Sequence, residues 1–251
     1  MPLNLQERLG LWRSILIYYG IPCRKRRLLQ FYRPFIQPGD LCFDVGSHVG
    51  NRLNVWTELG AQVVALEPQP LLMHFLRYWY GRRQNIKLIQ EAVGAFPGKA
   101  TMYASTKNPT VNSLSQSWIK KVKEDKSFAG VSWDQKLEVN VTTLDQLIQD
   151  YGPPTLCKID VEGYELQVLQ GLSYPIPMLS FEYIPAAIAR ALDCVRYLSL
   201  LGSYRFNWSC GESYQINSET WLTASEMLEV LSADLKSGKS GDIYARLNSE
   251  Q

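Results

Sequence analysis

The sequence has few histidines, no closely spaced cysteines and no long apolar run. Its two histidines, His48 and His74, lie far apart, and its five cysteines include no CxxC pair. Neither a zinc site nor a disulfide framework is therefore predicted, and no metal ligand is assigned. The longest apolar run near the N-terminus, Ile15–Tyr19, is much shorter than the ~20 residues that span a bilayer. Charged residues interrupt this N-terminal stretch and no small-residue cleavage site follows it, so we expect neither a transmembrane helix nor a secretory signal.

The composition is that of a globular protein. Of the 251 residues, 46% are hydrophobic and 20% are charged, and these values exclude a disordered or collagen-like chain. Cys42 and Cys157 lie within apolar runs. Their placement predicts buried thiols in a reducing, cytoplasmic compartment.

The net charge of +2 is unevenly distributed along the chain. Up to Asp40 there are seven basic residues and two acidic ones, so we predict a basic helical arm over residues 1–39, ahead of a domain over residues 40–251. We interpret the basic residues as a solvated helix face. The alternative is contact with an anionic membrane, because the cluster Arg24–Arg27 follows the aromatic stretch Trp12–Tyr19. Nucleic acid is a less favoured partner, since such aromatic residues more often pack than stack on bases.

From Leu41 onward the chain alternates between strand and helix patterns. Strands are predicted over residues 41–46, 63–67, 86–93, 156–161, 178–183, 204–209 and 242–247, and helices over 50–59, 71–80, 144–151, 165–172, 186–201 and 224–236. Thr223 and Glu226 have capping-box spacing at the start of the last helix. Repeated strand–helix units form a mostly parallel sheet with helices on both faces. We therefore predict an α/β fold with a seven-strand, doubly wound, mostly parallel sheet in which one strand at the edge is antiparallel.

The alternation is interrupted over residues 94–143. Two strand patterns, residues 100–105 and 137–143, flank a polar segment that contains the charge run Lys120–Lys126. A compact domain rarely keeps a long irregular stretch without a function for it. We interpret the segment as an inserted hairpin with a mobile tip, in which residues 108–133 form a lid over a substrate.

The first predicted strand ends in a glycine loop, Asp44–Gly50 (DVGSHVG). Open parallel sheets bind ligands at the carboxyl ends of their strands, and glycines allow a sharp turn close to a ligand. The spacing is GxxxG rather than the GxGxxG of a pyrophosphate-binding loop, so the loop alone is weak evidence. Glu67, followed by Pro68, ends the second strand, where an acidic side chain can accept hydrogen bonds from both ribose hydroxyls. Together these features favour an adenosine-containing ligand over a merely solvated carboxylate.

Charged side chains also end the next three strands. Glu91 and Ala92 lie at the end of the third strand, where an adenine would lie if Glu67 holds the ribose. The fourth strand ends with Lys158, Asp160 and Glu162, which strand alternation places on one face, and the fifth ends with Glu182. Ionisable groups are costly to bury without partners. A structural ion-pair cluster is one interpretation, but carboxylates from neighbouring strands at one edge of the sheet favour a functional site.

These motifs resemble the FkbM-type family of S-adenosylmethionine-dependent methyltransferases. The most specific of them is KIDVEGYELQVLQGL (Lys158–Leu172), and FDVGSHVG, VVALEPQP, VTTLDQLI, LSFEY and GDIYARL occur in the family's order, over roughly Asp40–Leu247. The resemblance implies a class I, Rossmann-like methyltransferase fold. It also implies cofactor contacts from the residues around the glycine loop and the strand ends, namely Asp44, Gly46, Ser47, Gly50, Glu67, Pro68, Glu91, Ala92 and Asp160. In this resemblance Asp160 and Glu162 lie near the transferable methyl group, and Ser47-His48 stands where the family usually has alanine-asparagine.

The function predicted from the resemblance is S-adenosylmethionine-dependent O-methylation of a hydroxyl on a sugar, a glycolipid or a secondary metabolite. An RNA methyltransferase is an alternative that would use the basic arm. A nicotinamide-dependent oxidoreductase would share the sheet, but the missing GxGxxG counts against it. A non-catalytic cofactor-binding module is the last alternative. The acceptor, the oligomeric state and any assisting divalent metal are not predicted.

Four residues are candidates for the catalytic machinery. A base that removes the hydroxyl proton typically contributes about 10²–10⁴-fold. We expect Asp160 to be this base, because it ends the strand that adjoins the first, with Glu182 as the second candidate and Glu162 as a modulator of the pKa of Asp160. His48 has a suitable ordinary pKa, but its place in the glycine loop favours a hydrogen-bonding role.

Overall fold

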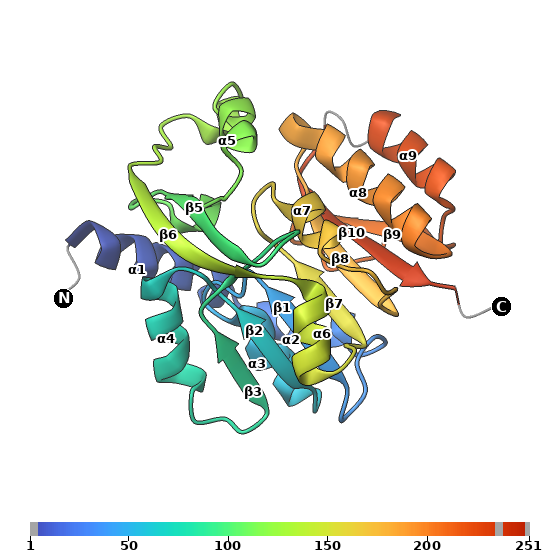
Figure 1. The fold of residues 1–251 in the computed structure, drawn as a ribbon, viewed down its shortest axis with the longest axis horizontal. Helices are drawn as coiled ribbons and strands as arrows, with labels where there is room; N and C mark the ends of the chain where they lie inside the picture. Colours follow the sequence, from blue (N-terminus) through green and yellow to red (C-terminus); the bar gives the residue numbers. More distant parts are fainter. Residues whose placement is uncertain (1–4, 234–237, 249–251) are drawn as a thin grey trace.

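The computed structural model describes residues 5–233 and 238–248. Two sheets form its framework (Figure 1). The main sheet has seven strands in the order β3-β2-β1-β7-β8-β10-β9, and a smaller sheet has the order β4-β6-β5. The strands of the main sheet are β1 (Leu41–Val45), β2 (Gln62–Leu66), β3 (Ile86–Ile89), β7 (Leu156–Ile159), β8 (Met178–Tyr183), β9 (Tyr204–Cys210) and β10 (Gly241–Leu247). Those of the smaller sheet are β4 (Ala92–Val93), β5 (Gly98–Ala104) and β6 (Gln135–Thr142).

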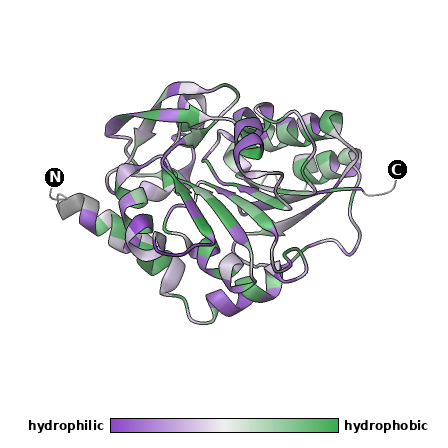
Figure 2. Ribbon diagram, turned by 60° about the horizontal axis from the view of Figure 1, so that its bottom comes forward, coloured by the Kyte–Doolittle hydropathy of each residue, from purple (hydrophilic) through white to green (hydrophobic). Residues whose placement is uncertain are grey.

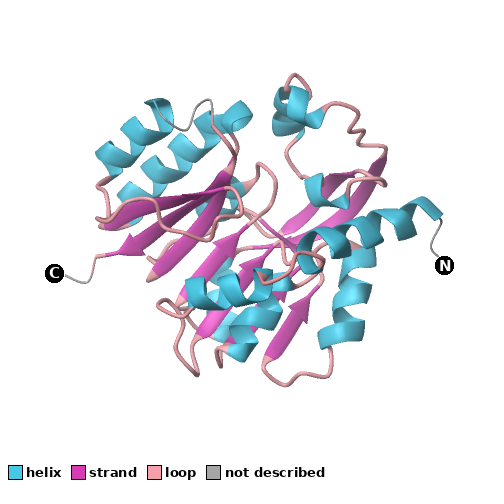
Figure 3. Ribbon diagram, turned by 180° about the vertical axis from the view of Figure 1, so that it is seen from behind, coloured by secondary structure: helices cyan, strands magenta, loops and turns pink. Residues whose placement is uncertain are grey.

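Helices cover both faces of the main sheet (Figure 3). Buried side chains of α2, α3 and α4 form one apolar cluster against it, and those of α6, α7, α8 and α9 form the other. The helices are α1 (Leu5–Tyr19), α2 (Arg24–Tyr32), α3 (Asn51–Glu58), α4 (Pro70–Tyr80), α5 (Gln116–Val122), α6 (Leu144–Tyr151), α7 (Glu165–Gln170), α8 (Ile188–Leu201) and α9 (Ala224–Ala233), with short 3-10 turns η1 (Pro109–Val111), η2 (Lys126–Phe128) and η3 (Pro185–Ala187). No helix in residues 5–233 or 238–248 is both long and apolar enough to cross a membrane.

The two-residue alternation of the strands supplies both apolar clusters. In β1, Phe43 and Val45 contribute to the cluster under α7 and α8, whereas Cys42 contributes to the opposite one. The central strands are accordingly mostly hydrophobic (Figure 2). Because every apolar side chain of β1 has a partner layer, the strand is fixed in register and its polar Asp44 is drawn into the interior at 0% exposure.

The seven-strand, mostly parallel sheet predicted from the sequence is confirmed. Antiparallel pairing occurs at its edge, where β10 runs antiparallel to both β8 and β9. The predicted capping box is also confirmed, since the Glu226 N–H donates to Thr223 Oγ1 at 3.3 Å and the Thr223 N–H donates to Glu226 Oε2 at 2.7 Å. The helix predicted over residues 224–236 is observed to Ala233, and its last three predicted positions lie outside the described residues.

Two local predictions are wrong. The third predicted strand is divided, because Ile86–Ile89 pairs with β2 whereas Ala92–Val93 leaves the main sheet and pairs with β6. The second error concerns the polar segment of the insert. The hairpin of β5 and β6 is present, but the charge run overlaps helix α5, which buries Trp118, Ile119 and Val122. Helix α5 therefore has a charged face toward solvent and an apolar face that packs on the domain.

Candidate functional site

The glycine loop after β1 brings two strand ends together. Gly46 has φ +84°, and a Cβ at this position would lie 1.9 Å from the backbone oxygen of Asp160. Only glycine therefore lets the ends of β1 and β7 approach this closely. Ser47 is fully buried and its Oγ donates to the backbone oxygen of Asp44 at 2.8 Å, which closes the turn. His48 follows with φ +50°, an uncommon conformation for a residue with a side chain.

Glu67 lies directly behind this loop and is 2% exposed. One carboxylate oxygen accepts the backbone N–H of His48 at 3.0 Å, and the other accepts that of Gln69 at 2.9 Å. Burial raises the pKa of Glu67 to about 7, although the two N–H donors oppose the shift. The carboxylate is thus fixed in orientation, and each oxygen keeps acceptor capacity for a ligand.

The carboxylate of Glu67 lines a cavity of about 720 Å³ that is partly open to solvent. Its lining combines apolar side chains with a few polar groups, as is typical of small-molecule sites. It brings together eight of the predicted site residues, which are Gly46, His48, Glu67, Pro68, Glu91, Ala92, Asp160 and Glu162. Further walls come from Tyr18 of α1 and from the insert through Met102, Pro109, Thr110, Asn112 and Leu114.

Three predicted cofactor residues do not line this cavity. Asp44 is fully buried beneath it, and Ser47 acts within the loop turn. Gly50 precedes α3 with φ +75°, and a Cβ there would lie 2.8 Å from both Leu76 and Tyr80. These three residues fix the shape of the loop on the side that faces away from the cavity.

Charged side chains form a row of ion pairs below the carboxyl ends of β1 and β7. Arg52 of α3 contacts Asp160 at 2.5 Å and Asp44 at 3.7 Å. Lys158, which is fully buried, contacts Asp242 at 2.8 Å and Asp160 at 3.7 Å. Burial disfavours the charge of Asp160, but Lys158 and Arg52 outweigh it and lower the pKa of this carboxyl to about 2. Asp160 is therefore an ion-paired carboxylate at all ordinary pH values.

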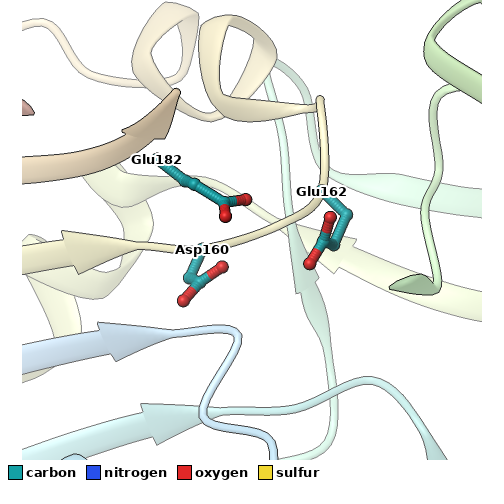
Figure 4. A group of neighbouring side chains, drawn as sticks. All are labelled: Asp160, Glu162 and Glu182. Carbon is teal, nitrogen blue, oxygen red and sulfur yellow. The ribbon is translucent and has the colours of Figure 1, made fainter. Parts of the chain in front are cut away.

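Asp160, Glu162 and Glu182 converge from the ends of β7 and β8 (Figure 4). One oxygen from each lies within 4.8 Å of the others. Within the described part of the chain, neither Glu162 nor Glu182 has a cation within ion-pair distance. Burial, and then the charge of Asp160, raise the pKa of Glu162 well above its usual range, and burial followed by Glu162 does the same for Glu182. Carboxylate oxygens are the donors that hard divalent cations prefer, so these three residues are the ones that could hold such an ion.

A second cavity of about 640 Å³ adjoins the first. The two share Tyr18, Asn51, Arg52, Asp160 and Glu162. The remaining lining of the second cavity comes from Leu28, Tyr32, Glu182, Gly211, Glu212, Tyr214, Ser240, Gly241 and Asp242. The two cavities are therefore neighbours that have these five side chains in common.

His48 is held neutral in this environment. Burial lowers its pKa to about 4, and neither ring nitrogen has a hydrogen-bond partner within the described residues. Its ring lies 5.3 Å from that of Tyr18. A neutral imidazole with free nitrogens on the cavity wall suits hydrogen bonding to a ligand.

Sequence reasoning missed Tyr18, Arg52 and Asp242. Arg52 follows the glycine loop by two residues, so the helix periodicity that turns it toward Asp44 could have identified it. Asp242 lies in the GDIYARL stretch and alternates with Tyr244 on the face of Lys158. Tyr18 had no such signal, because only the packing of α1 brings it to the strand ends.

Comparison with known proteins adds a sequence family. The model of the "Methyltransferase FkbM domain" matches residues 44–182, a span that runs from Asp44 to Glu182 and covers more than half of the chain. No curated protein sequence matches the chain.

Similar solved structures have low sequence identity. A precorrin-6y C5,15-methyltransferase from Geobacter metallireducens is 11% identical, with a TM-score of 0.47 and coverage of 88% of this chain and 87% of that chain. An O-methyltransferase from Bacillus cereus, in complex with SAH, is 12% identical, with a TM-score of 0.45 and coverage of 99% and 93%. The C-terminal domain of a precorrin-6Y C5,15-methyltransferase from Rhodobacter capsulatus is 10% identical, with a TM-score of 0.43 and coverage of 89% and 88%.

Proposed function

The chain belongs to the FkbM methyltransferase family, and we propose from this that it transfers a methyl group from S-adenosylmethionine to a hydroxyl group of a polyhydroxylated small molecule. The observation that carries the proposal is the buried, oriented carboxylate of Glu67 at the wall of the first cavity. The second cavity, which meets the first at five residues, supplies the place for the acceptor.

The residues of the first cavity fit this cofactor. Glu67 offers two anchored oxygens to the ribose diol. Ala92 and Leu114 offer apolar surface beyond it, and the free ring nitrogens of His48 lie at the loop end of the cavity. When bound, the cofactor supplies an activated methyl group. The residues of the chain then have to place the acceptor hydroxyl and take its proton.

The second cavity favours a neutral, hydroxyl-rich acceptor. Its lining contains five carboxylates, of Asp160, Glu162, Glu182, Glu212 and Asp242, together with the hydroxyls of Tyr18, Tyr32 and Tyr214. Carboxylates accept hydrogen bonds from hydroxyl groups and repel anions. A sugar ring, with its many hydroxyl donors, satisfies this pattern of acceptors.

Glu162 is our candidate for the general base. It lines both cavities, and it has φ +52°, a strained conformation of the kind that occurs at active sites. Its raised pKa makes the ionised form a stronger base than Asp160, whose pKa is held near 2 by its cations. In this assignment Asp160 positions Arg52 and Lys158. The carboxyl group of Glu182 lies beside that of Glu162, so the two groups share one negative charge.

The insert remains our candidate lid. Pro109, Thr110 and Asn112 line the first cavity, and Gln69 Oε1 accepts a hydrogen bond from Asn112 Nδ2 at 2.6 Å. Closure of the segment 108–133 would exclude water from the methyl group.

Cofactor binding and methyl transfer test the proposal directly. S-adenosylhomocysteine should raise the melting temperature in a concentration-dependent way, whereas NAD should not. Labelled S-adenosylmethionine should label methyl glycosides but not an RNA oligonucleotide. Stabilisation by NAD instead of S-adenosylhomocysteine would refute the methyltransferase assignment, and labelling of RNA alone would refute the acceptor class.

A further inference from the structure

Helix α1 packs with its less apolar side inward. Gly10 contacts the insert so closely that a Cβ would lie 2.7 Å from the backbone oxygen of Thr106, and Ser14 is 1% exposed. One turn later Tyr18 lines both cavities. Gly10, Ser14 and Tyr18 are spaced four residues apart, so they share one face of the helix.

The outward side of the same helix is apolar. Leu9, Trp12 and Leu16 are 60%, 62% and 64% exposed, and their spacing of three and four residues makes one continuous stripe. Ile21, in the turn after the helix, is 45% exposed, whereas the Tyr19 hydroxyl donates to the backbone oxygen of Val49 at 2.9 Å and so holds that ring against the domain. A contiguous exposed apolar surface of this kind marks an interaction site.

Positive charge surrounds this outer stripe (Leu9, Trp12, Leu16 and Ile21). Arg8, Arg13, Arg26 and Arg27 are exposed around it or directly after it in the chain. Arg24 is not part of this charge, because it is 3% exposed and contacts Glu212 at 2.6 Å. The surface therefore combines apolar side chains, an exposed Trp, and cations.

We propose that the outer stripe of α1 docks on the surface of an anionic lipid bilayer, with the helix lying in the interface plane. The helix cannot cross the bilayer, and its extension away from the body of the molecule leaves this side free (Figures 1 and 3). Amphipathic helices with basic residues and a Trp bind in this way. If the proposed function holds, Tyr18 on the inner face then places the second cavity beside the bilayer, and the acceptor is a sugar carried by a lipid.

Charge favours a bilayer over a second copy of the chain. In a two-fold dimer through this stripe the same surface would meet itself. The arginines of one protomer would then approach those of its partner, and like charges at an interface are repulsive. Anionic headgroups instead neutralise them, with each basic residue strengthening binding by roughly fivefold.

Vesicle flotation with paired variants tests the proposal. Wild-type protein should float with phosphatidylcholine vesicles that contain phosphatidylglycerol, more weakly at high salt, and not with phosphatidylcholine alone. Trp12→Ser with Leu16→Ser should weaken binding by about tenfold or more. The matched control is Tyr174→Ser with Leu200→Ser, which removes an exposed aromatic residue and an exposed leucine (70% and 87%) just before the amino ends of β8 and β9, away from the site.

Three outcomes overturn the docking proposal. They are absence of flotation at low salt, equal flotation of the stripe variant and the wild type, and a dimer in light scattering that the stripe variant dissociates. S-adenosylhomocysteine binding is measured calorimetrically on the same proteins. Flotation without cofactor binding refutes the proposed function alone, whereas cofactor binding without flotation refutes the docking alone.

Discussion

Burial disfavours the charge of Glu67 and of the carboxylates at the ends of β7 and β8 alike, yet their pKa values differ widely. Glu67 has only backbone donors near it, so its pKa rises to about 7. Asp160 has two cations, so its pKa falls to about 2. Glu162 has neither such donors nor such cations, so its pKa stays strongly raised. The identity of the neighbours, rather than the depth of burial, therefore separates the three carboxylates, in keeping with the roles proposed for them in binding, positioning and proton transfer.

Glu67→Gln should weaken S-adenosylhomocysteine binding by about tenfold or more, because charge-assisted bonds to the ribose are each worth about 1.5–3 kcal/mol. In the wild type the affinity should rise with pH through about 7, as the carboxylate ionises, and the variant should lose this dependence. Calorimetry at several pH values measures both effects. Glu138→Gln, an exposed acid paired with Lys99 at 2.7 Å, is the control that should change neither.

The free enzyme should show the opposite dependence in its stability. The pKa of Glu67 is higher in the folded state than its ordinary value of 4.5, so the unfolded state binds fewer protons between these values. The contribution of Glu67 to the free energy of unfolding therefore falls as pH rises from about 4.5 to 7. Denaturant titrations should show a smaller decrease for Glu67→Gln than for the wild type.

Glu162→Gln should lower kcat by at least about 10²-fold and leave cofactor affinity within a few-fold. In the wild type kcat/KM should fall as pH drops through the raised pKa of this group, since the base must be ionised. Removal of the charge also relieves repulsion from Asp160, so the variant should unfold at the same or a higher temperature. Asp160→Asn should instead lower the melting temperature, because Arg52 and Lys158 lose their shared anion. If Asp160→Asn abolished turnover while Glu162→Gln did not, Asp160 would be the base.

At the scale of elements, strand and helix order followed from apolar periodicity, but two local features did not. The division of the third strand depends on Ala92 pairing with Val141, a partner 49 positions away, which the local pattern does not contain. Helix α5 depends on Trp118, whose indole would lie 2.1 Å from a Cβ at Gly163. Both features are set by tertiary contacts, so periodicity alone could not identify them. Similarly, Glu67 and Asp160 were found because they end strands, whereas Tyr18 reaches the site only through helix packing.

The contact between Trp118 and Gly163 predicts a large effect of a single methyl group. Gly163→Ala should lower the free energy of unfolding by about 2–4 kcal/mol, because it adds an overpacked contact to a strained φ of +86°. Gly130→Ala is the matched control: its φ is +80°, and a Cβ there would have nothing within 4 Å. Urea denaturation should show a clearly smaller loss for Gly130→Ala. Equal losses would mean that the indole moves aside and that α5 is not anchored at this point.

At the scale of the whole molecule, a buried arginine joins the N-terminal helices to the loop after β9. Arg24 donates from Nε to the hydroxyl of Tyr214 at 2.8 Å, contacts Glu212 at 2.6 Å, and lies 5.0 Å from the ring centroid of Tyr18. Its partners belong to α1 and to the loop after β9, and together they close the second cavity. The side chain of Arg24 therefore connects the N-terminal helices to the wall of the second cavity.

Arg24→Ala should loosen the arm without unfolding the sheet. We expect a loss of about 1–3 kcal/mol, less than for a fully buried pair because Glu212 is more than half exposed. Hydrogen exchange should accelerate across residues 5–32 but remain slow in β1 and β7. Arg26→Ala removes an exposed arginine of the same helix and should leave exchange unchanged. Uniform acceleration over the whole chain would contradict a local role.

The division of the walls between the two cavities has a consequence for how this enzyme can change. The segment that matches the family, residues 44–182, contains Glu67 and Glu162, whereas the outer wall of the second cavity comes from α1, α2, the loop at Gly211–Tyr214 and the start of β10. Under the proposed function, exchange of the terminal segments would alter acceptor choice while leaving Glu67 and Glu162 in place. We therefore expect the wall of the second cavity to be exchangeable against an unchanged first cavity, and chimaeras joined near Asp40 and Ser203 test this expectation directly.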